Sequence, residues 1–316
     1  MKNYAKLIKL TLIVVTTAIM FSCSDDDGTT YNNNSIVAIA SGTSNLSILV
    51  DALERTDLVE TLDQTGPYTV FAPTNAAFTT FLSANGYANL DAVPTAALKE
   101  ILLNHVVSGT NLSTSLSTGY IKTLAKGSAS STNTLSMFVN TSSGVRLNGV
   151  SNVTSADVVA SNGVVHIVDA VIGLPTVVTH ALANPNFTNL VDALTSEGQP
   201  DFVGILSGTA SSPFTVFAPS NAAFTAFETE NPGTLASLTP AQLTSVLSYH
   251  VVAGANVLSN AIPSGPITTY ETGTFTVSGT VITDEAARQT NIVAVDVQAS
   301  NGVIHVLDNI ILPDLD

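Results

Sequence analysis

The sequence predicts a chain of two similar modules, each combining short helices with a closing pair of strands. Three blocks occur twice, in the same order. TVFAPTNAAF at 69–78 returns as TVFAPSNAAF at 215–224, HVV at 105–107 returns at 250–252, and SNGVVH at 161–166 returns as SNGVIH at 300–305. The offsets are 146, 145 and 139 residues. A repeating unit of about 140 residues is the size of a domain, so each copy should bury a core of its own.

The first helix of each copy is predicted by apolar residues at helical spacing. They are Leu46, Leu49, Val50 and Leu53 in one copy, and Leu190, Val191 and Leu194 in the other. Ser44 is placed to cap the first of these helices, and Thr188 precedes the second. The offset between the two copies grows from 141 at this helix to 146 at the next strand. The second copy therefore holds about five extra residues between them, within 197–209.

A short strand and a capped helix follow. The β-rich runs 68–72 and 214–218 each stop at a proline. Thr74 and Ser220 come directly after these prolines and are predicted to cap the next helix. A hydroxyl in this position can be a nucleophile in hydrolases, but the glycine-rich elbow of those enzymes is missing here. We therefore interpret both hydroxyls as caps.

The next helix ends in a histidine in both copies. In the second copy, Thr239-Pro240-Ala241-Gln242 has the pattern of a capping box with proline at the first helical position. His250 then continues the apolar stripe of this helix, and His105 occupies the same place in the first copy. A histidine on an apolar face near a helix end is expected to hydrogen-bond a buried backbone group. We favour this structural role over a catalytic or ligand-binding one.

Each copy closes with a predicted hairpin. Strands at 156–160 and 164–168 flank Ser161-Asn162-Gly163, and the pattern repeats around Asn301-Gly302. Asn-Gly is a strong signal for a tight hairpin turn. The last strands, 164–168 and 303–307, are apolar on both faces and are predicted to lie inside a sheet or sandwich.

The N-terminal segment predicts export and lipid anchoring. Residues 1–22 have three lysines followed by a short apolar run, as in a secretory signal peptide. Met20-Phe21-Ser22-Cys23 resembles a bacterial lipobox, in which the cysteine becomes the lipid-modified N-terminus; the alternative is an ordinary signal with an incidental cysteine. Residues 23–35 are acidic and polar and should be a disordered tether. The acidic run after Cys23 also resembles a surface-export signal, so we expect a surface-exposed outer-membrane lipoprotein of the bacterial envelope.

Composition limits the possible partners. The 316 residues include 45% hydrophobic and only 10% charged residues, with a formal net charge of −15. Beyond the signal only six Lys and Arg remain against 24 Asp and Glu. Such a surface disfavours nucleic acid and anionic lipid as partners, so any contact with a membrane should be through the lipid anchor alone. With Cys23 acylated, no thiol is left for a disulfide, a nucleophile or a metal site.

The candidate polar residues do not form a recognisable catalytic or metal-binding pattern. Four of the five histidines are repeated pairs, His105 with His250 and His166 with His305; His180 is the fifth. No carboxylate stands at helical spacing beside them, and no His-Glu-x-x-His pattern occurs. The repeated acids are Asp157 with Asp296 and Asp169 with Asp308. They lie on or beside the closing strands, where hydrogen bonding to loops is the expected role. The sequence therefore predicts no enzyme, no metal and no cofactor.

Taken together, these blocks resemble those of the fasciclin-like domain family. TVFAPTNAAF resembles the first signature of that family, Tyr249-His250 its tyrosine–histidine motif, and NGVIHVLD at 301–308 its second signature. The resemblance implies an α+β fold in which each module is a wedge-like β-sandwich with several small helices. It divides the chain into a first module at 36–175 and a second at 176–316.

The same resemblance implies adhesion or extracellular interaction with a protein or a matrix polysaccharide. In animal relatives the tyrosine–histidine motif is implicated in receptor binding. That role transfers only to Leu247, Tyr249, His250 and Val251, because the first copy has Asn104 where the second has Tyr249. Some members of the family are associated with carotenoids, so binding of an apolar small molecule, a pigment or a lipid, is the alternative function.

Overall fold

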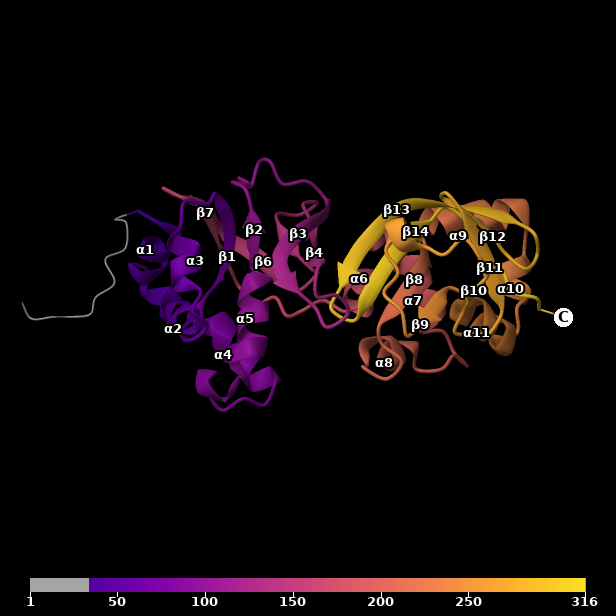
Figure 1. Ribbon diagram of the computed structural model, residues 1–316, viewed down its shortest axis with the longest axis horizontal. Helices are drawn as coiled ribbons and strands as arrows, with labels where there is room; N and C mark the ends of the chain where they lie inside the picture. Colours follow the sequence, from indigo (N-terminus) through magenta and orange to yellow (C-terminus); the bar gives the residue numbers. More distant parts are fainter. Residues whose placement is uncertain (1–33, 316) are drawn as a thin grey trace, which may run out of the picture. The chain divides into compact units, whose positions relative to one another are not determined.

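A computed structural model describes residues 34–315, which form two modules in tandem (Figure 1). The predicted signal peptide, Cys23 and all but the end of the predicted tether lie outside the described residues. Within 34–315 no helix has the length and apolarity that a bilayer crossing requires.

The first module combines a helical layer with a closed barrel of seven strands, β1 to β7 in sequential order. Its helices are α1 (Ile36–Ser41), η1 (Ser44–Leu46), α2 (Ser47–Arg55), α3 (Val59–Asp63), α4 (Asn75–Ala84), η2 (Leu90–Ala92) and α5 (Thr95–Leu103). Its strands are β1 (Tyr68–Pro73), β2 (Val106–Ser108), β3 (Gly119–Lys126), β4 (Thr134–Asn140), β5 (Arg146–Leu147), β6 (Ser151–Ala160) and β7 (Gly163–Val168).

The second module repeats this plan with a seven-stranded sheet of order β10-β11-β12-β13-β14-β8-β9. Its helices are α6 (Val177–Ala183), η3 (Pro185–Phe187), α7 (Thr188–Leu194), α8 (Phe202–Ser207), α9 (Asn221–Glu230), α10 (Thr234–Ser237), α11 (Pro240–Tyr249) and η4 (Ser259–Ala261). Its strands are β8 (Phe214–Pro219), β9 (Val251–Ala253), β10 (Ile267–Thr268), β11 (Thr274–Ser278), β12 (Val281–Thr283), β13 (Gln289–Ala299) and β14 (Gly302–Leu307). The predicted α+β class is confirmed in both modules.

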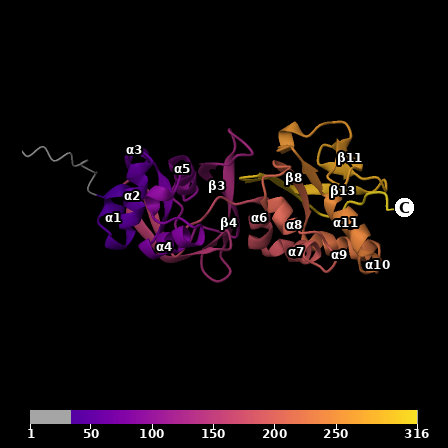
Figure 2. The same cartoon turned by 90° about the horizontal axis from the view of Figure 1, so that it is seen from below.

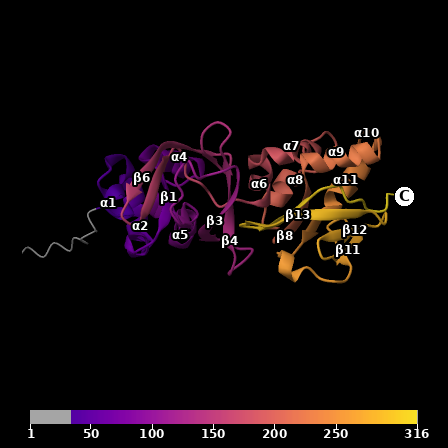
Figure 3. The same ribbon diagram turned by 90° about the horizontal axis from the view of Figure 1, so that it is seen from above.

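Each module has its main core between its helices and the strands of its first and last blocks. In the second module, α6 to α9 gather on one side of β8 and β13 (Figures 2 and 3). The corresponding core includes Phe187, Phe202 and Phe214, each at most 2% exposed. The strands predicted to be interior are buried along nearly their whole length. Their apolar side chains on both faces are explained by this position, because β7 pairs with β1 and β6, and β14 with β8 and β13.

The glycine of the Asn-Gly pair has a different role from the one predicted. Ala160 pairs with Gly163, so the two-residue turn is Ser161-Asn162 and Gly163 already belongs to β7. Gly163 has φ 153°, and a Cβ built on it would lie 1.9 Å from the carbonyl oxygen of Tyr68. The glycine is therefore required by the close approach of β1, a contact between strands that are distant in sequence.

The predicted helix caps are confirmed except for one. Thr74 and Ser220 accept hydrogen bonds from the third residue of α4 and α9, and Thr239 with Gln242 completes the capping box of α11. Ser44 was expected to cap the first long helix, and this prediction is wrong. A 3₁₀ turn occupies 44–46, so α2 begins at Ser47 without a capping side chain at its own N-cap position.

Candidate functional site

The paired histidines His105 and His250 tie a helix end to the C-terminal segment of each module. His105 Nδ1 lies 2.7 Å from the carbonyl oxygen of Ile101, and Nε2 accepts the amide N–H of Ile172 at 2.9 Å. His250 repeats this, with Val246 O at 2.8 Å and the Ile311 amide at 3.3 Å. Because Nε2 accepts a hydrogen bond, the ring proton is on Nδ1. Burial lowers the pKa of both rings to about 4, so both are neutral at neutral pH.

The residues proposed for receptor binding lie in the core of the second module. The exposed fractions are 5% for Leu247, 0% for Tyr249, 3% for His250 and 4% for Val251. The Tyr249 hydroxyl donates to the carbonyl oxygen of Thr274 at 2.7 Å and accepts the Glu285 amide at 3.2 Å. Burial raises the pKa of this phenol. The folded module therefore does not present these side chains to a partner, and their role in binding stays a prediction.

The second pair, His166 and His305, fixes a loop against the last strand. Nε2 of His166 donates to the carbonyl oxygen of Asn111, and Nε2 of His305 to that of Val257, both at 2.9 Å. The Nδ1 atom of His166 accepts the amide N–H of Asp157 at 3.2 Å. This proton arrangement is the reverse of that in His105.

The repeated aspartates hold loops through paired hydrogen bonds. Asp157 accepts both the amide and the hydroxyl of Ser113, and Asp296 does the same with Ser259, at 2.6–2.8 Å. The hydrogen bonds from Ser113 lower the pKa of Asp157. Both aspartates have a positive φ, 62° and 60°, at irregularities in the pairing of β6 and β13. Such a bulge turns the carboxylate toward the neighbouring loop.

Asp169 and Asp308 make a second matched clamp. Each carboxylate accepts the backbone amide and the side-chain amide of one asparagine, Asn152 or Asn291, at 2.7–2.9 Å. Both aspartates immediately follow the last strand of their module, so the clamp joins the end of that strand to its antiparallel neighbour. The geometry corresponds to the expected role of hydrogen bonding to neighbouring loops and strands.

Two repeated asparagines were not identified by sequence reasoning as structural residues. Asn75 Oδ1 accepts the Ile48 amide in α2, and Asn221 Oδ1 accepts the Asn189 amide in α7, both at 3.0 Å. The asparagine of the first signature thus caps the preceding helix from a distance, which explains why α2 needs no local cap. The sequence did contain a signal for this role, because the asparagine occurs in both copies directly after a capping hydroxyl.

His180, the histidine without a repeated counterpart, packs against an aromatic side chain. It is fully buried in α6, and its ring packs edge-on against Tyr120 with the centroids 5.4 Å apart. Burial lowers its pKa to about 4, although the backbone of Gln298 slightly favours the protonated ring. Among the described residues neither ring nitrogen has a hydrogen-bond partner of normal geometry.

The described part of the chain contains no group of side chains that could bind a metal ion together. Within 34–315 no three His, Cys, Asp or Glu side chains gather closely enough to hold a metal ion. The four repeated histidines instead make separate contacts with backbone carbonyl groups. These histidine contacts hold loops and helix ends in place.

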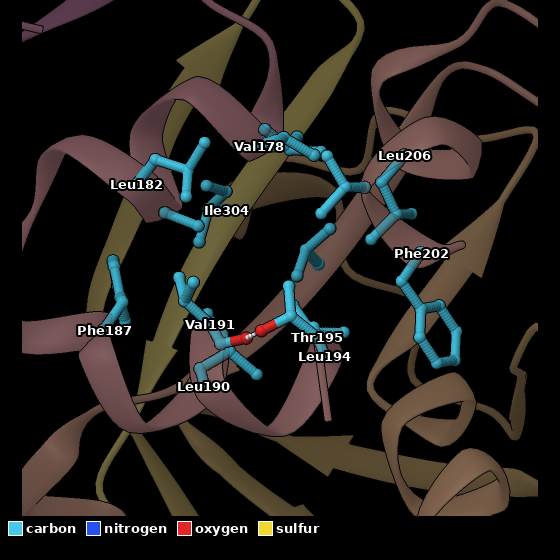
Figure 4. A pocket seen from close by; sticks show the side chains of 15 residues that line it. Val178, Leu182, Phe187, Leu190, Val191, Leu194, Thr195, Phe202, Leu206 and Ile304 are labelled. Carbon is cyan, nitrogen blue, oxygen red and sulfur yellow. Dashed lines mark hydrogen bonds between the residues drawn. The ribbon is translucent and has the colours of Figure 1, made fainter. Parts of the chain in front are cut away.

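A small apolar hollow lies in the helical layer of the second module. Side chains from α6, α7 and α8 converge on β8 and β14 around it (Figure 4). Its volume is about 40 Å³. The fifteen lining residues are Val177, Val178, Ala181, Leu182, Phe187, Leu190, Val191, Leu194, Thr195, Phe202, Val203, Leu206, Val216, Ala218 and Ile304. Its walls are hydrocarbon, but its volume is well below the roughly 300–1,000 Å³ that is typical of small-molecule sites.

The two modules differ at this position. The helical layer of the first module encloses a smaller hollow of about 10 Å³. There the segment after α2 supplies Leu58, which is 2% exposed and belongs to the core. The longer segment after α7 reads Ser-Glu-Gly-Gln-Pro-Asp at 196–201 and leads into Phe202, which is 2% exposed and belongs to the core of the second module. The insertion predicted from the offsets therefore coincides with the larger hollow.

These observations define a tandem pair of small α+β modules whose repeated polar residues are used internally. Comparison with known proteins places the chain in a family. The Fasciclin domain matches residues 44–175 and 185–313, so this protein belongs to the fasciclin domain family. The suspected resemblance is thereby confirmed over most of the chain.

The chain is similar to several named proteins of this family. It is 39% identical over 138 residues to protein sll1483 of Synechocystis, covering 44% of this chain and 72% of that one. It is 26% identical over 268 residues to human periostin, covering 83% of this chain but only 30% of periostin. Among solved structures, the domain pair of the insect cell adhesion molecule fasciclin I matches with a TM-score of 0.53 and 20% identity. That match covers 86% of this chain and 97% of the insect one, and it shows the shared fold.

Proposed function

We propose that this protein is a non-enzymatic interaction protein of the bacterial cell surface, anchored by a lipid on Cys23, whose modules bind a protein or a matrix polymer. The main support is the twofold fasciclin match together with the adhesion role named for the insect fasciclin I pair. The low fraction of charged residues, 10%, gives a surface of neutral polar groups suited to such a partner. The anchor is supported by the lipobox-like sequence ending at Cys23.

The non-enzymatic part of the proposal is supported by how the histidines are used. Both ring nitrogens of His105, His166 and His250 are hydrogen-bonded to backbone groups within their own module. A ring held in this way has no free nitrogen to exchange a proton with a substrate. Incubation with candidate matrix polysaccharides tests this directly, and measurable turnover would overturn the proposal.

Anchoring and exposure have separate tests. Replacing Cys23 by Ala should move the protein from the membrane fraction to the soluble fraction, whereas unchanged fractionation would contradict lipid anchoring. Protease treatment of intact cells should cut the tether and release both modules if the protein faces outward. Full protection in intact cells, with cleavage after the outer membrane is permeabilised, would place the protein in the periplasm instead.

The partner can be sought with a soluble fragment beginning at Ser35. Fragments that carry both modules, the first alone and the second alone should be used side by side as bait. Capture of the same partner by the intact pair and by one module would assign the binding surface to that module. Absence of any saturable partner among envelope and matrix components would contradict an adhesion role.

A second candidate function is binding of an apolar small molecule in the second module. The observation that favours it is the hollow between α6, α7 and α8, which has hydrocarbon walls and, at about 40 Å³, is larger than the hollow of about 10 Å³ in the first module. Solvent extraction of purified protein should then yield a pigment or lipid in a fixed ratio to protein. Protein that contains no extractable ligand and binds none on addition would exclude this candidate.

A further inference from the structure

A groove open to solvent lies in the helical layer of the second module and shares no lining residue with the apolar hollow. It runs between α7, α9 and α10, which lie in a row in Figures 2 and 3. Its volume is about 430 Å³, within the roughly 300–1,000 Å³ that is typical of small-molecule sites. The lining residues are Asn189 of α7, Phe224, Thr225, Glu228 and Thr229 of α9, and Leu235 of α10.

The walls of the groove are held together by hydrogen bonds from the repeated asparagine of α9. Asn221 Oδ1 accepts the backbone amide of Asn189 at 3.0 Å, and its Nδ2 donates to the carbonyl oxygen of Pro185 at 2.9 Å. The far end of α9 is tied to the start of α10, because Glu228 Oε1 accepts the backbone amide of Gly233. These hydrogen bonds fix the walls of the groove without a ligand.

The first copy has apolar residues at two positions where the groove is polar. By the offsets of the two helices, Asn189 corresponds to Ile48 and Glu228 to Leu82. The first correspondence also holds in the structure, because Asn75 Oδ1 accepts the Ile48 amide as Asn221 accepts that of Asn189. Ile48 and Leu82 pack against the core of the first module. The fold therefore accepts apolar side chains here, and it does not require the polar residues of the second copy.

The first module also holds the segment after α4 with an arginine that the second module lacks. The Arg55 guanidinium donates to three backbone carbonyl oxygens within residues 90–93. Phe78 of α4 is fully buried there. In the second module Ser196 occupies the position of Arg55, and Phe224, the counterpart of Phe78, is partly exposed and lines the groove. The second module therefore offers part of an aromatic ring that the first one buries.

The polar atoms along the groove are mostly hydrogen-bond acceptors. Thr225 and Thr229 donate their hydroxyl protons to the carbonyl oxygens of Asn221 and Thr225, so each hydroxyl oxygen is left as an acceptor. Within residues 34–315, Glu228 Oε2 and the side-chain amide of Asn189 have no hydrogen-bond partner. The amide adds two donors and one acceptor. A ligand that satisfies these walls must therefore bring several donor groups of its own.

Charge and apolar surface limit the ligand further. The lining residues include the carboxylate of Glu228 but no cation, so an anionic group would be repelled. Residues 176–316 contain twelve Asp and Glu and a single Arg, and Arg288 is engaged by Glu230 and by the carbonyl oxygen of Ile310. Phe224 and Leu235 add apolar surface. A neutral sugar ring matches this combination, because it has a C–H face and hydroxyl donors around its edge.

We infer that this groove binds a neutral sugar unit of a polysaccharide. Asn189 and Glu228 hydrogen-bond the hydroxyls of the sugar, and Phe224 and Leu235 pack against its C–H face. Because the groove is open to solvent, a unit within a longer chain can enter it. This inference rests on the proposed interaction function and names the class of polymer and the module that binds it.

The test is calorimetric titration of full-length protein carrying Cys23→Ala with oligosaccharides of defined charge. The neutral probes are oligomers of glucose, xylose, mannose and N-acetylglucosamine; the anionic probe is oligogalacturonate, and pentalysine is the cationic one. At least one neutral oligomer should bind saturably and roughly tenfold or more tightly than oligogalacturonate. Absence of saturable binding for every neutral oligomer would overturn the inference. Tighter binding of pentalysine than of any sugar would also overturn it and would assign the groove to a basic peptide.

The duplication supplies the variants that locate the site. Asn189→Ile and Glu228→Leu install the residues of the first copy, which the fold already accepts there. Each should weaken binding of the best neutral oligomer by roughly fivefold or more, the loss expected for one hydrogen bond. Asn186→Ala changes an exposed asparagine just before α7 and outside the groove, and it should leave the affinity unchanged. Equal affinities for all three variants and the parent protein would exclude the groove as the sugar site.

A further variant separates sugar binding from the support of α10. Glu228→Leu also removes the acceptor for the Gly233 amide, whereas Glu228→Gln keeps an oxygen for it. Glu228→Gln should melt like the parent protein and bind the neutral oligomer more tightly than Glu228→Leu does.

The inference and the proposed function fail in different ways. Capture of a partner by the soluble fragment that both Asn189→Ile and Glu228→Leu leave unchanged would overturn the inference and keep the interaction role. Absence of any saturable partner for the parent protein would contradict the proposed function itself.

Discussion

At the scale of single residues, the repeated polar side chains act as internal connectors. His105 and His250 each join the last turn of a helix to a distant backbone amide, and Tyr249 joins two segments through one hydroxyl. Each connector is buried, so the loss of one partner leaves another polar group without a hydrogen bond. A buried polar group without a partner costs more folding free energy than the original hydrogen bond contributes.

Replacing His250 by Ala should therefore lower the free energy of unfolding of the second module by about 1–3 kcal/mol. His105→Ala should do the same to the first module. Chemical denaturation of the separate modules measures both values, and partner binding should fall only in proportion to unfolding. A His250→Ala protein with normal stability but no partner binding would refute the structural role.

His180 is expected to behave in the opposite way, because its ring nitrogens have no hydrogen-bond partner among residues 34–315. His180→Phe keeps a ring against Tyr120 and removes two unsatisfied polar atoms. The change should be neutral or should stabilise the second module by about 1 kcal/mol. Thermal unfolding checks this, and a large loss of stability would indicate a hydrogen bond that the described geometry does not contain.

At the scale of elements, an asparagine in the closing hairpin attaches the first helix of each module. Asn162 Oδ1 accepts the Ile36 amide at the start of α1, and its Nδ2 donates to the carbonyl oxygens of Leu62 and Gln64. Asn301 repeats this by accepting the Val177 amide of α6 and donating to Leu206. A turn residue thus connects elements that are more than 90 residues apart in the sequence.

Replacing Asn162 by Ala should destabilise the first module by roughly 2 kcal/mol or more, because several buried backbone groups lose their partner together. Hydrogen exchange should show the largest loss of protection at the start of α1 and after α3. Asn85→Ala, at an exposed helix end, is a suitable control and should cost well under about 1 kcal/mol. Similar effects of the two substitutions would argue against the proposed attachment.

At the scale of the whole molecule, three buried histidines make stability depend on pH. Burial lowers the pKa of His105, His180 and His250 from 6.5 to about 4. Between these values the unfolded chain binds protons that the folded chain does not, so acid favours unfolding. The stability from these neutral rings is complete above about pH 6.5 and is lost as the pH falls toward about 4.

Unfolding free energy should therefore decrease by several kcal/mol between about pH 7 and pH 4, with an upper limit of about 3 kcal/mol for each histidine. Urea titrations over this range measure the slope, and His180→Phe should reduce it by about a third. Asp157, whose pKa is lowered, adds a separate loss of stability only below about pH 4. A flat profile between pH 7 and 4 would show that these rings keep their ordinary pKa in the folded state.

The sequence by itself determined the two copies, the interior closing strands and most helix caps, because these depend on short-range patterns. Periodicity of apolar residues and the residue types next to a helix start are readable along the chain. The burial of both strand faces in 164–168 and 303–307 is readable in the same way. The sequence also located the insertion at 197–209, but it did not show what the insertion does to the helical layer.

Only the tertiary structure decided what the repeated polar residues contact. Gly163 is needed for the approach of Tyr68, and Asn75 caps a helix that begins 28 residues earlier. The burial of Tyr249 and the apolar hollow in the second module also depend on packing between distant segments. Such contacts form between residues with no local relation in the sequence, so spacing and composition along one chain cannot specify them.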